Sequence, residues 1–328
     1  MQKFLFFIKV FLKSIIAVCV CLFVFLFPIV YSFADKNNDV NKHFYTNSQD
    51  IVLDMWHIEA FEGGSTARSA YLDKVFKLYQ KQNQGVFVSL KTMTIDEYNI
   101  NIKNQMPDII SFTRDCEGVE KYLSTLPYPK DIDKKLLQGC KKDSAYICYP
   151  YMIGRYALVS KNENAKDSLC SQIYQQKKIK VFPLGFAQNV LSQKVLQENN
   201  LKYNSNAKVY ESQYDCYKGF LSGEITTILA SQRDVHRLKN RENLGRIENL
   251  YYTYLNGFTD LVQYIGVIES SKSVDIAKDF VQFLIKKESQ NLISSCGMFS
   301  PFYKIYKDDY MKKWEDSISY TKLESLFE

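Results

Sequence analysis

The apolar run IVLDMW at residues 51–56 sets the fold, because so short and hydrophobic a run is typical of a buried strand. A turn, FEGGS at 61–65, follows it, and Ser65 can cap a helix. Over 66–84 apolar side chains recur every three or four residues, which predicts one amphipathic helix. Gly85 then stands where helices usually end. The sequence therefore begins its fold with a strand, a turn and a helix.

The next segment repeats this order. Alternating apolar residues over 86–90 predict a second strand. Thr94 and Glu97 fit a capping box that opens a second helix, which ends before Pro107. DIISF at 108–112 predicts a third strand. Strands that alternate with helices imply parallel pairing with right-handed crossovers, so the predicted fold class is α/β.

Polar side chains follow the first and third strands at their carboxyl ends. These ends carry WHIE at 56–59 and FTRD at 112–115. Because ligands of parallel sheets bind beyond the carboxyl ends of the strands, these two loops are the predicted binding region. The backbone N–H groups of EGGS at 62–65 can hold an anion at a helix start; a tight turn with a helix cap is the alternative.

The second half of the chain predicts further strands and helices in a less regular order. We expect strands at 155–159, 225–230 and 258–267, and helices at 188–199, 213–221 and 273–284. The predicted strand at 225–230 is followed by SQRD at 231–234. The segment 301–328 is charged and is predicted to be a helical tail.

The first 34 residues have the order of a secretory signal. Three lysines precede an uncharged run over 14–34, and Ser32-Phe33-Ala34 offers small residues to a signal peptidase before Asp35. The run is also long enough to span a bilayer, so an uncleaved N-terminal anchor is the rival interpretation. Both interpretations predict an exported protein, extracellular or on the cell surface. The Asn-rich segment 35–49 predicts a flexible tether.

Charge balance and cysteine spacing give no support to a nucleic-acid-binding protein or a zinc protein. The 42 basic residues only slightly outnumber the 36 acidic ones, which gives no case for a nucleic-acid partner. The cysteines after residue 34 show no C-x-x-C and no zinc spacing; they are Cys116, Cys140, Cys148, Cys170, Cys216 and Cys296. Cys140 and Cys148 are the nearest pair. Export permits disulfides, but pairing cannot be read from the sequence, and buried free thiols are the alternative.

Several segments together resemble one family. MWH at 55–57, EGGS at 62–65 and PDIISF at 107–112 look like the opening lobe of extracellular solute-binding proteins of ATP-driven (ABC) importers. The subgroup is the sugar-binding, maltose-binding-like one. Later agreement comes from YPY and YAL at 149–151 and 156–158, GE through QRD at 223–234, FTDL at 258–261 and GMFS at 297–300. The resemblance covers about residues 50–300, although the chain is short for the family and shows no lipid-anchor cysteine.

The resemblance implies a two-lobed, periplasmic-binding-protein-like (type II) α/β fold with a hinge and an interlobe cleft. Lobe 1 would comprise 50–150 with 258–300, and lobe 2 would comprise 151–257. Such a protein binds a small solute, here a sugar or oligosaccharide, and delivers it to a membrane permease. It performs no catalysis and needs no cofactor or metal, and we expect a monomer.

The resemblance also implies ligand-binding residues: Phe112, Asp115, Arg233, Arg155, Tyr149, Tyr151, His57, Glu59, Arg114 and Asp234. An aromatic ring beside a carboxylate suits a sugar, which offers an apolar face and hydroxyl groups. Three arginines near one site suggest a solute with negative charge or many acceptors. The alternatives are core packing for the aromatic rings, a structural role for His57, and ion pairs between the arginines and the nearby acids.

Two other functions stay open on the sequence. A secreted carbohydrate-active enzyme would need paired carboxylates, which can be far apart in the chain. No G-x-S-x-G, H-E-x-x-H or phosphate-binding glycine loop occurs in the sequence. A membrane-anchored ligand sensor would use the same cleft and would keep the N-terminal segment.

Overall fold

The computed structural model describes residues 50–316 and 322–323, except 60–67, 131, 133, 164–165, 167–168, 171, 177, 189, 256–257 and 260. The predicted signal or anchor, the tether at 35–49 and the EGGS turn lie outside the described residues. Within the described part, none of the helices has the length and hydrophobicity that crossing a membrane requires.

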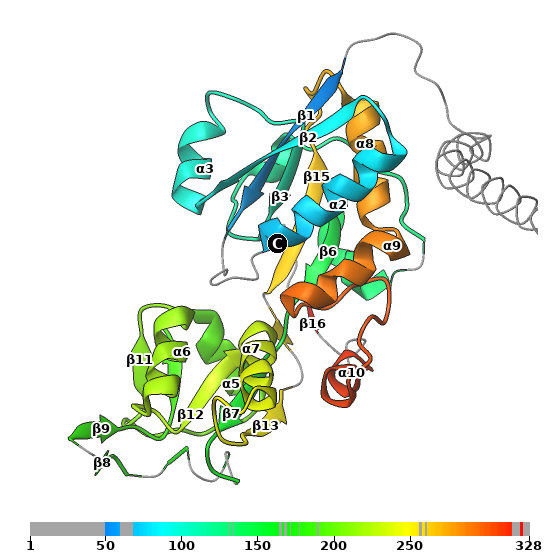
Figure 1. Cartoon of the computed structure of the whole chain (residues 1–328). Helices are drawn as coiled ribbons and strands as arrows, with labels where there is room; N and C mark the ends of the chain where they lie inside the picture. Colours follow the sequence, from blue (N-terminus) through cyan, green and yellow to red (C-terminus); the bar gives the residue numbers. More distant parts are fainter. Residues whose placement is uncertain are drawn as a thin grey trace, which may run out of the picture. The chain divides into compact units, whose positions relative to one another are not determined.

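The first sheet contains five strands in the order β2-β1-β3-β15-β6 (Figure 1). They are β1 (Ile51–Ile58), β2 (Val86–Met93), β3 (Ile109–Phe112), β6 (Tyr149–Ile153) and β15 (Val262–Val267). As predicted, β1 pairs in parallel with both β2 and β3. By contrast, β15 runs antiparallel to β3 and to β6. A strand from late in the chain therefore completes a sheet that begins at residue 51.

Helices cover both faces of this sheet. On one face, Leu53 and Met55 pack in an apolar cluster with α2 and α8; on the other, Trp56 and Ile58 pack with α3 and the segment that follows β3. The elements are α2 (Arg68–Gln82), α8 (Val274–Leu284), α9 (Lys287–Gln290), η3 (Asn291–Cys296), α3 (Ile95–Asn101), η1 (Val119–Lys121), η2 (Lys134–Cys140), β4 (Lys141–Lys142) and β5 (Ala145–Tyr146).

Local sequence signals account for the ends of these helices. Gly85 has φ +83°, a left-handed conformation that glycine adopts without strain, and it ends the turn after α2. The Thr94 side chain accepts from the backbone of Glu97, and the Glu97 side chain accepts in return from the Thr94 backbone. The capping box predicted at the start of α3 is confirmed.

The second sheet also contains five strands, in the order β11-β10-β12-β7-β13. They are β7 (Tyr156–Ser160), β10 (Gly185–Ala187), β11 (Lys208–Tyr210), β12 (Thr227–Ser231) and β13 (Tyr251–Tyr254). Ala157 and Val159 of β7 face the cluster with α6, α7 and α10, whereas Tyr156 and Leu158 face α5. The helices are α5 (Val190–Glu198), α6 (Gln213–Ser222), α7 (Gln232–Asn243) and α10 (Asp309–Asp316).

Both sheets follow one plan. In the first sheet β1 lies between its parallel neighbours β2 and β3, and in the second sheet β10 lies between β11 and β12. An antiparallel strand comes next, β15 beside β3 and β7 beside β12. The edge strands β6 and β13 complete the two sheets. Two α/β lobes of matching topology therefore make up the folded chain. Three short pairs stand outside the large sheets: β4 with β5, β8 (Tyr174–Gln176) with β9 (Ile179–Val181), and β14 (Phe258–Thr259) with β16 (Lys322–Leu323).

Two predicted elements are wrong in extent. The strand expected over 258–267 is two strands, β14 and β15, because Leu261 bonds elsewhere: Leu261 N donates to Thr259 Oγ1, and Leu261 O accepts from Gly154 N. Among the described residues of the predicted helical tail, 301–316 and 322–323, only α10 is helical, since 301–308 contains no helix and β16 is extended. In α10, Met311 and Trp314 are buried, so packing supports this helix.

Candidate functional site

Three chain segments cross between the lobes at one place. Ile153 and Phe299 exchange two backbone hydrogen bonds of 2.9 and 2.8 Å. Gly154 N donates to Leu261 O at 2.5 Å, and the Thr259 hydroxyl donates to Gly154 O at 2.6 Å. The crossing segments 153–155, 259–261 and 298–300 therefore bond to one another as well as to their own lobes.

The side chains of Gln232 and Arg155 form further hydrogen bonds at this crossing. The Gln232 amide oxygen accepts from Arg155 N at 2.8 Å, and Gln232 N donates to Arg155 O at 2.7 Å. The Arg155 guanidinium donates to the carbonyls of Trp314 and Leu255 at 3.0 and 3.3 Å. Burial lowers the pKa of Arg155 to about 10. Arg155, a predicted ligand residue, thus has its charge turned toward backbone carbonyls inside the crossing.

A buried polar cluster lies beneath the carboxyl ends of β1 and β3. The Ser111 hydroxyl is 2.8 Å from His57 Nδ1 and 2.9 Å from the Tyr151 hydroxyl. Gln263 Nε2 donates to Ser111 Oγ at 2.9 Å, while Gln263 Oε1 accepts from Arg68 Nη1 at 2.5 Å. Gln263 lies where the register of β15 against β6 shifts, an irregularity that can re-aim a side chain. Gln263 therefore links Ser111 of β3 to Arg68, the first residue of α2, by hydrogen bonds.

The His57–Ser111 contact has the spacing of a base and a hydroxyl nucleophile, but its surroundings favour structure over chemistry. Both side chains are fully buried. The Ser111 oxygen is already shared with Tyr151 and Gln263. A nucleophile must reach its substrate, so this pair stabilises the first lobe rather than attacking a solute.

Several other predicted ligand residues are also buried. Phe112 is fully buried and stacks on Tyr264 at 5.8 Å. The Tyr149 hydroxyl donates to Pro127 O at 2.5 Å and accepts from Gln282. Tyr151 stacks on Tyr71 at 6.2 Å. In this conformation all three predicted aromatic rings pack inside the first lobe.

Asp234 and Arg233 lie at the start of α7. Asp234 completes a capping box with Ser231, whose hydroxyl donates to its carboxylate at 3.0 Å, and it also accepts from Gln213 at 2.8 Å. Burial raises the pKa of the Asp234 carboxyl, against these hydrogen bonds that lower it. Arg233 is only 5% exposed. Both residues follow β12, as predicted, but their side chains turn inward.

Three predicted residues do reach the surface at the carboxyl edge of the first sheet. Glu59 directly follows β1 and is half-buried; Arg114 and Asp115 follow β3 and are half-buried and exposed, respectively. The Thr113 hydroxyl lies 3.4 Å from the Asp115 carboxylate and donates to it. β1 and β3 are direct neighbours in the sheet, so these loops start side by side.

Sequence reasoning missed Ser111, Gln263 and Arg68 of the buried cluster. Ser111 and Gln263 are each the polar member of an otherwise apolar strand, in IISF and VQYIGV. Because a buried polar group must find a partner, such isolated polar residues signal an internal hydrogen-bond network. The partners themselves are 152 and 195 residues apart in the chain, so no local pattern pairs them.

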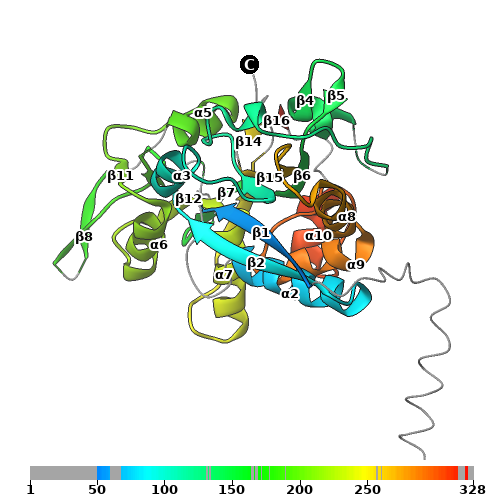
Figure 2. The same ribbon diagram turned by 90° about the horizontal axis from the view of Figure 1, so that it is seen from above.

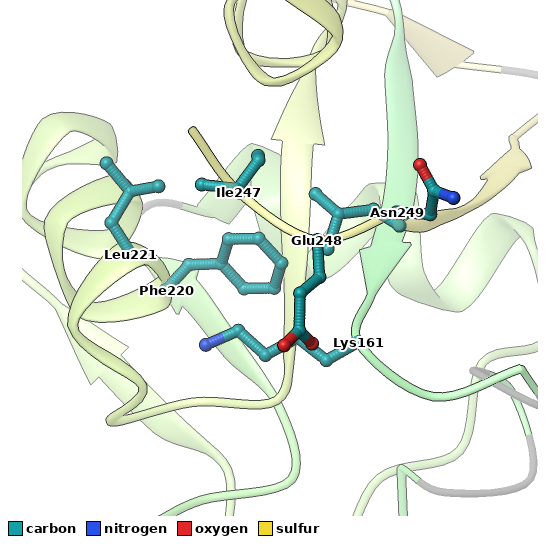
Figure 3. A pocket seen from close by; sticks show the side chains of 7 residues that line it. Lys161, Phe220, Leu221, Ile247, Glu248 and Asn249 are labelled. Carbon is teal, nitrogen blue, oxygen red and sulfur yellow. The ribbon is translucent and has the colours of Figure 1, made fainter. Parts of the chain in front are cut away.

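A cavity of about 230 Å³ opens in the second lobe, away from these loops. Leu221, Ile247 and Leu250 form apolar walls beside the Phe220 ring, and Lys161 and Glu248 flank it (Figure 3). Lys161 follows Ser160, which pairs with Thr227 at the beginning of β12. The cavity therefore lies at the amino end of the parallel strands, opposite the edge where Ser231 ends β12.

Solved structures share this arrangement. The GacH receptor of Streptomyces glaucescens, solved unliganded and with acarbose, aligns with a TM-score of 0.61 and 12% identity over 85% of this chain and 89% of that one. The chain has the periplasmic-binding-protein-like fold. The sugar-binding protein MalE from Xanthomonas citri aligns with a TM-score of 0.58 and 13% identity, covering 83% and 86% of the two chains.

The same fold also serves a different cargo. Iron-bound HitA from Pseudomonas aeruginosa aligns with a TM-score of 0.53 and 15% identity over 79% of this chain and 89% of its own. No protein-family model and no curated protein matches the sequence. At sequence identities this low, the structural alignments show the shared fold alone, so the ligand has to be argued from the residues of this chain.

Proposed function

We propose that this protein binds a small extracellular solute, a sugar or oligosaccharide, between its lobes and delivers it unchanged to an ABC-type membrane permease. The observation that carries the proposal is the pair of lobes with matching sheets, joined by three short crossings that bond to one another. Lobes joined by such short crossings can close on a ligand by hinge motion. Binding without catalysis fits the buried state of the His57–Ser111 pair.

The proposed ligand contacts on the first lobe are Glu59, Arg114 and Asp115. A carboxylate accepts hydrogen bonds from sugar hydroxyls, and a guanidinium donates to hydroxyl or carboxylate oxygens. Asp115 is the most exposed of the three and directly follows the β3 end. His57, Phe112, Tyr149 and Tyr151 would then act beneath the site, by fixing the strands that carry these loops.

The second lobe offers polar groups at the carboxyl ends of its own parallel strands. Exposed Gln188 follows β10, and half-buried Ser231 ends β12. Neutral amide and hydroxyl groups there suit a polyhydroxylated solute better than a bare anion. Arg114 on the first lobe could instead pair with the carboxylate of an acidic sugar, so acidic saccharides are tested beside neutral ones.

Mass spectrometry of small molecules released from the purified protein identifies a carried ligand directly. Isothermal titration with neutral oligosaccharides and with their uronic-acid counterparts then ranks the two classes. We expect a neutral or acidic saccharide to bind and to raise the melting temperature, with the saccharide recovered intact. Asp115→Asn should weaken binding, whereas the control Asp96→Asn on the exposed face of α3 should not.

The alternatives give different results. Cleavage of a saccharide during incubation would replace the proposal with an enzymatic function. Export is part of the proposal, and N-terminal sequencing of the mature protein checks it: a start at Asp35 means release from a signal, whereas an intact Met1 means an anchor. An anchored protein that binds its solute without any permease-dependent uptake would be a sensor.

A further inference from the structure

The first lobe buries two cysteines against each other. Cys140 ends η2, and Cys148 directly precedes β6. Both side chains are fully buried and belong to the same apolar cluster. Burial, and after it the neighbouring Cys148 side chain, raises the pKa of the Cys140 thiol, as expected of two thiols that lie close together.

A short hairpin holds the two residues in this position. Lys141 pairs with Tyr146 and Lys142 with Ala145, and the hairpin projects from the first lobe in Figure 2. Ile147 N donates to Cys140 O at 3.0 Å, which extends the pairing to Cys140 and to the residue before Cys148. The hairpin therefore keeps the two cysteines near each other along the backbone, and their burial in one apolar cluster keeps both side chains inside the lobe.

We propose that Cys140 and Cys148 form a disulfide in the exported protein. This inference rests on the export that the proposed function includes, since disulfides persist in oxidising compartments. The oxidant is an exported thiol–disulfide oxidoreductase or a small-molecule disulfide. The two cysteine S–H bonds are lost, one S–S bond forms, and two electrons and two protons pass to the oxidant, whose own disulfide becomes two thiols.

The other cysteines are less suited to compete. Cys116 shares the apolar cluster of Cys140 and Cys148 but lies 24 residues before Cys140 in the chain. Cys216 and Cys296 belong to different apolar clusters, and Cys170 is exposed in the second lobe. A loop as short as the one between Cys140 and Cys148 closes at a small entropic cost. Burial raises the pKa of the Cys140 thiol, so the thiolate needed for exchange is scarce after folding. The bond therefore forms early, while the hairpin is made but the core is still open.

The bond would fasten η2 to β6 under the proposed site. Tyr264 lies close to both thiols and stacks on Phe112, the last residue of β3. A crosslink at this point would restrain the segment after β3 that leads away from Arg114 and Asp115. The predicted role is to stabilise the lobe, not to take part in binding.

Peptide mapping tests the bond. The full chain is exported to the periplasm of a bacterial host, denatured in N-ethylmaleimide without reductant, and digested with trypsin. Cleavage after Lys141 and Lys142 places the two cysteines in separate peptides, 136–141 and 143–155. We expect these peptides to remain joined, two hydrogen atoms lighter than their sum, and to separate on reduction. In a parallel sample given N-ethylmaleimide before denaturation, exposed Cys170 should be alkylated and buried Cys216 should not.

A second arm separates failure of export from failure of the pairing. The reduced, denatured full chain is refolded in a mixture of reduced and oxidised glutathione. The joined peptides should form there even if the host does not export the protein. Alkylation of both peptides as separate species in the refolded sample, or a bond from either cysteine to a different one, would overturn the proposal.

Discussion

Replacing Gly154 by alanine tests whether the crossing is as tightly packed as its contacts indicate. A Cβ atom at this position would lie 2.5 Å from the Gln232 amide oxygen and 2.6 Å from Leu261 Cβ. Neither neighbour moves easily. Gln232 is fully buried and its oxygen accepts from Arg155 N, while the Leu261 backbone is bonded to Gly154 itself.

Three contributions set the magnitude. Overpacking a buried position costs about 1–3 kcal/mol. Displacing the Gln232 amide from Arg155 N loses about 1 kcal/mol of hydrogen bonding. Alanine reduces the entropy of the unfolded chain, which returns about 0.4–1 kcal/mol. The net expectation is a loss of about 1–3.6 kcal/mol in the free energy of unfolding, the balance of these three effects.

Urea denaturation of a double-mutant cycle measures this loss. Gly154→Ala, Gln232→Ala and the double variant are compared with the parent at equal m-values. Removing the Gln232 amide deletes the nearest clashing atom, so the alanine at 154 should cost less in that background. We expect a coupling energy above about 0.5 kcal/mol, the size that distinguishes residues in contact from independent ones. Purely additive effects, or a stabilising Gly154→Ala, would refute the packing argument.

Three further outcomes are expected. Arg155→Met should destabilise the protein by about 2–3 kcal/mol, since hydrogen bonds from a charged group are lost. Amide hydrogen exchange in α10 should speed up first, because Trp314 O loses its donor. A uniform increase in exchange across the chain would contradict this. Burial lowers the pKa of His236, so the unfolded state binds the proton of this side chain more readily than the folded state does. The contribution of His236 to stability should therefore fall as the pH drops below 6.5. A His236→Asn variant whose urea midpoint changes with pH as in the parent would exclude this role. Asp115→Asn should weaken saccharide binding about tenfold, about 1.4 kcal/mol, with the melting temperature unchanged, and equal loss in Asp96→Asn would point to a non-specific charge effect.

Much of the first lobe could be predicted because its signals are local. Gly85, the Thr94–Glu97 capping box and the IVLDMW run each act through neighbours in the sequence, and the structure places all three as predicted. The parallel pairing of β1 with β2 and β3 follows from strand–helix alternation in the same way.

The burial of the predicted ligand residues could not be derived from local pattern. Phe112 sits at the end of its strand, but whether its ring faces solvent depends on Tyr264, which arrives from 152 positions later in the chain. Arg155 looks available in sequence, yet Trp314 O and Leu255 O occupy its guanidinium through α10 and the linker before β14. Long-range partners of this kind decide which side chains remain for a ligand.

The late origin of β15 has a consequence for synthesis. Strands of the second sheet all come from one continuous stretch, β7 to β13, whereas the first sheet lacks its fourth strand until residues 262–267 have been made. The sheet whose first strand emerges earliest from the ribosome is thus the one whose strands are completed last. Under the proposed export, the chain passes unfolded through a translocation channel, and this order delays completion of the first sheet until β15 has been synthesised.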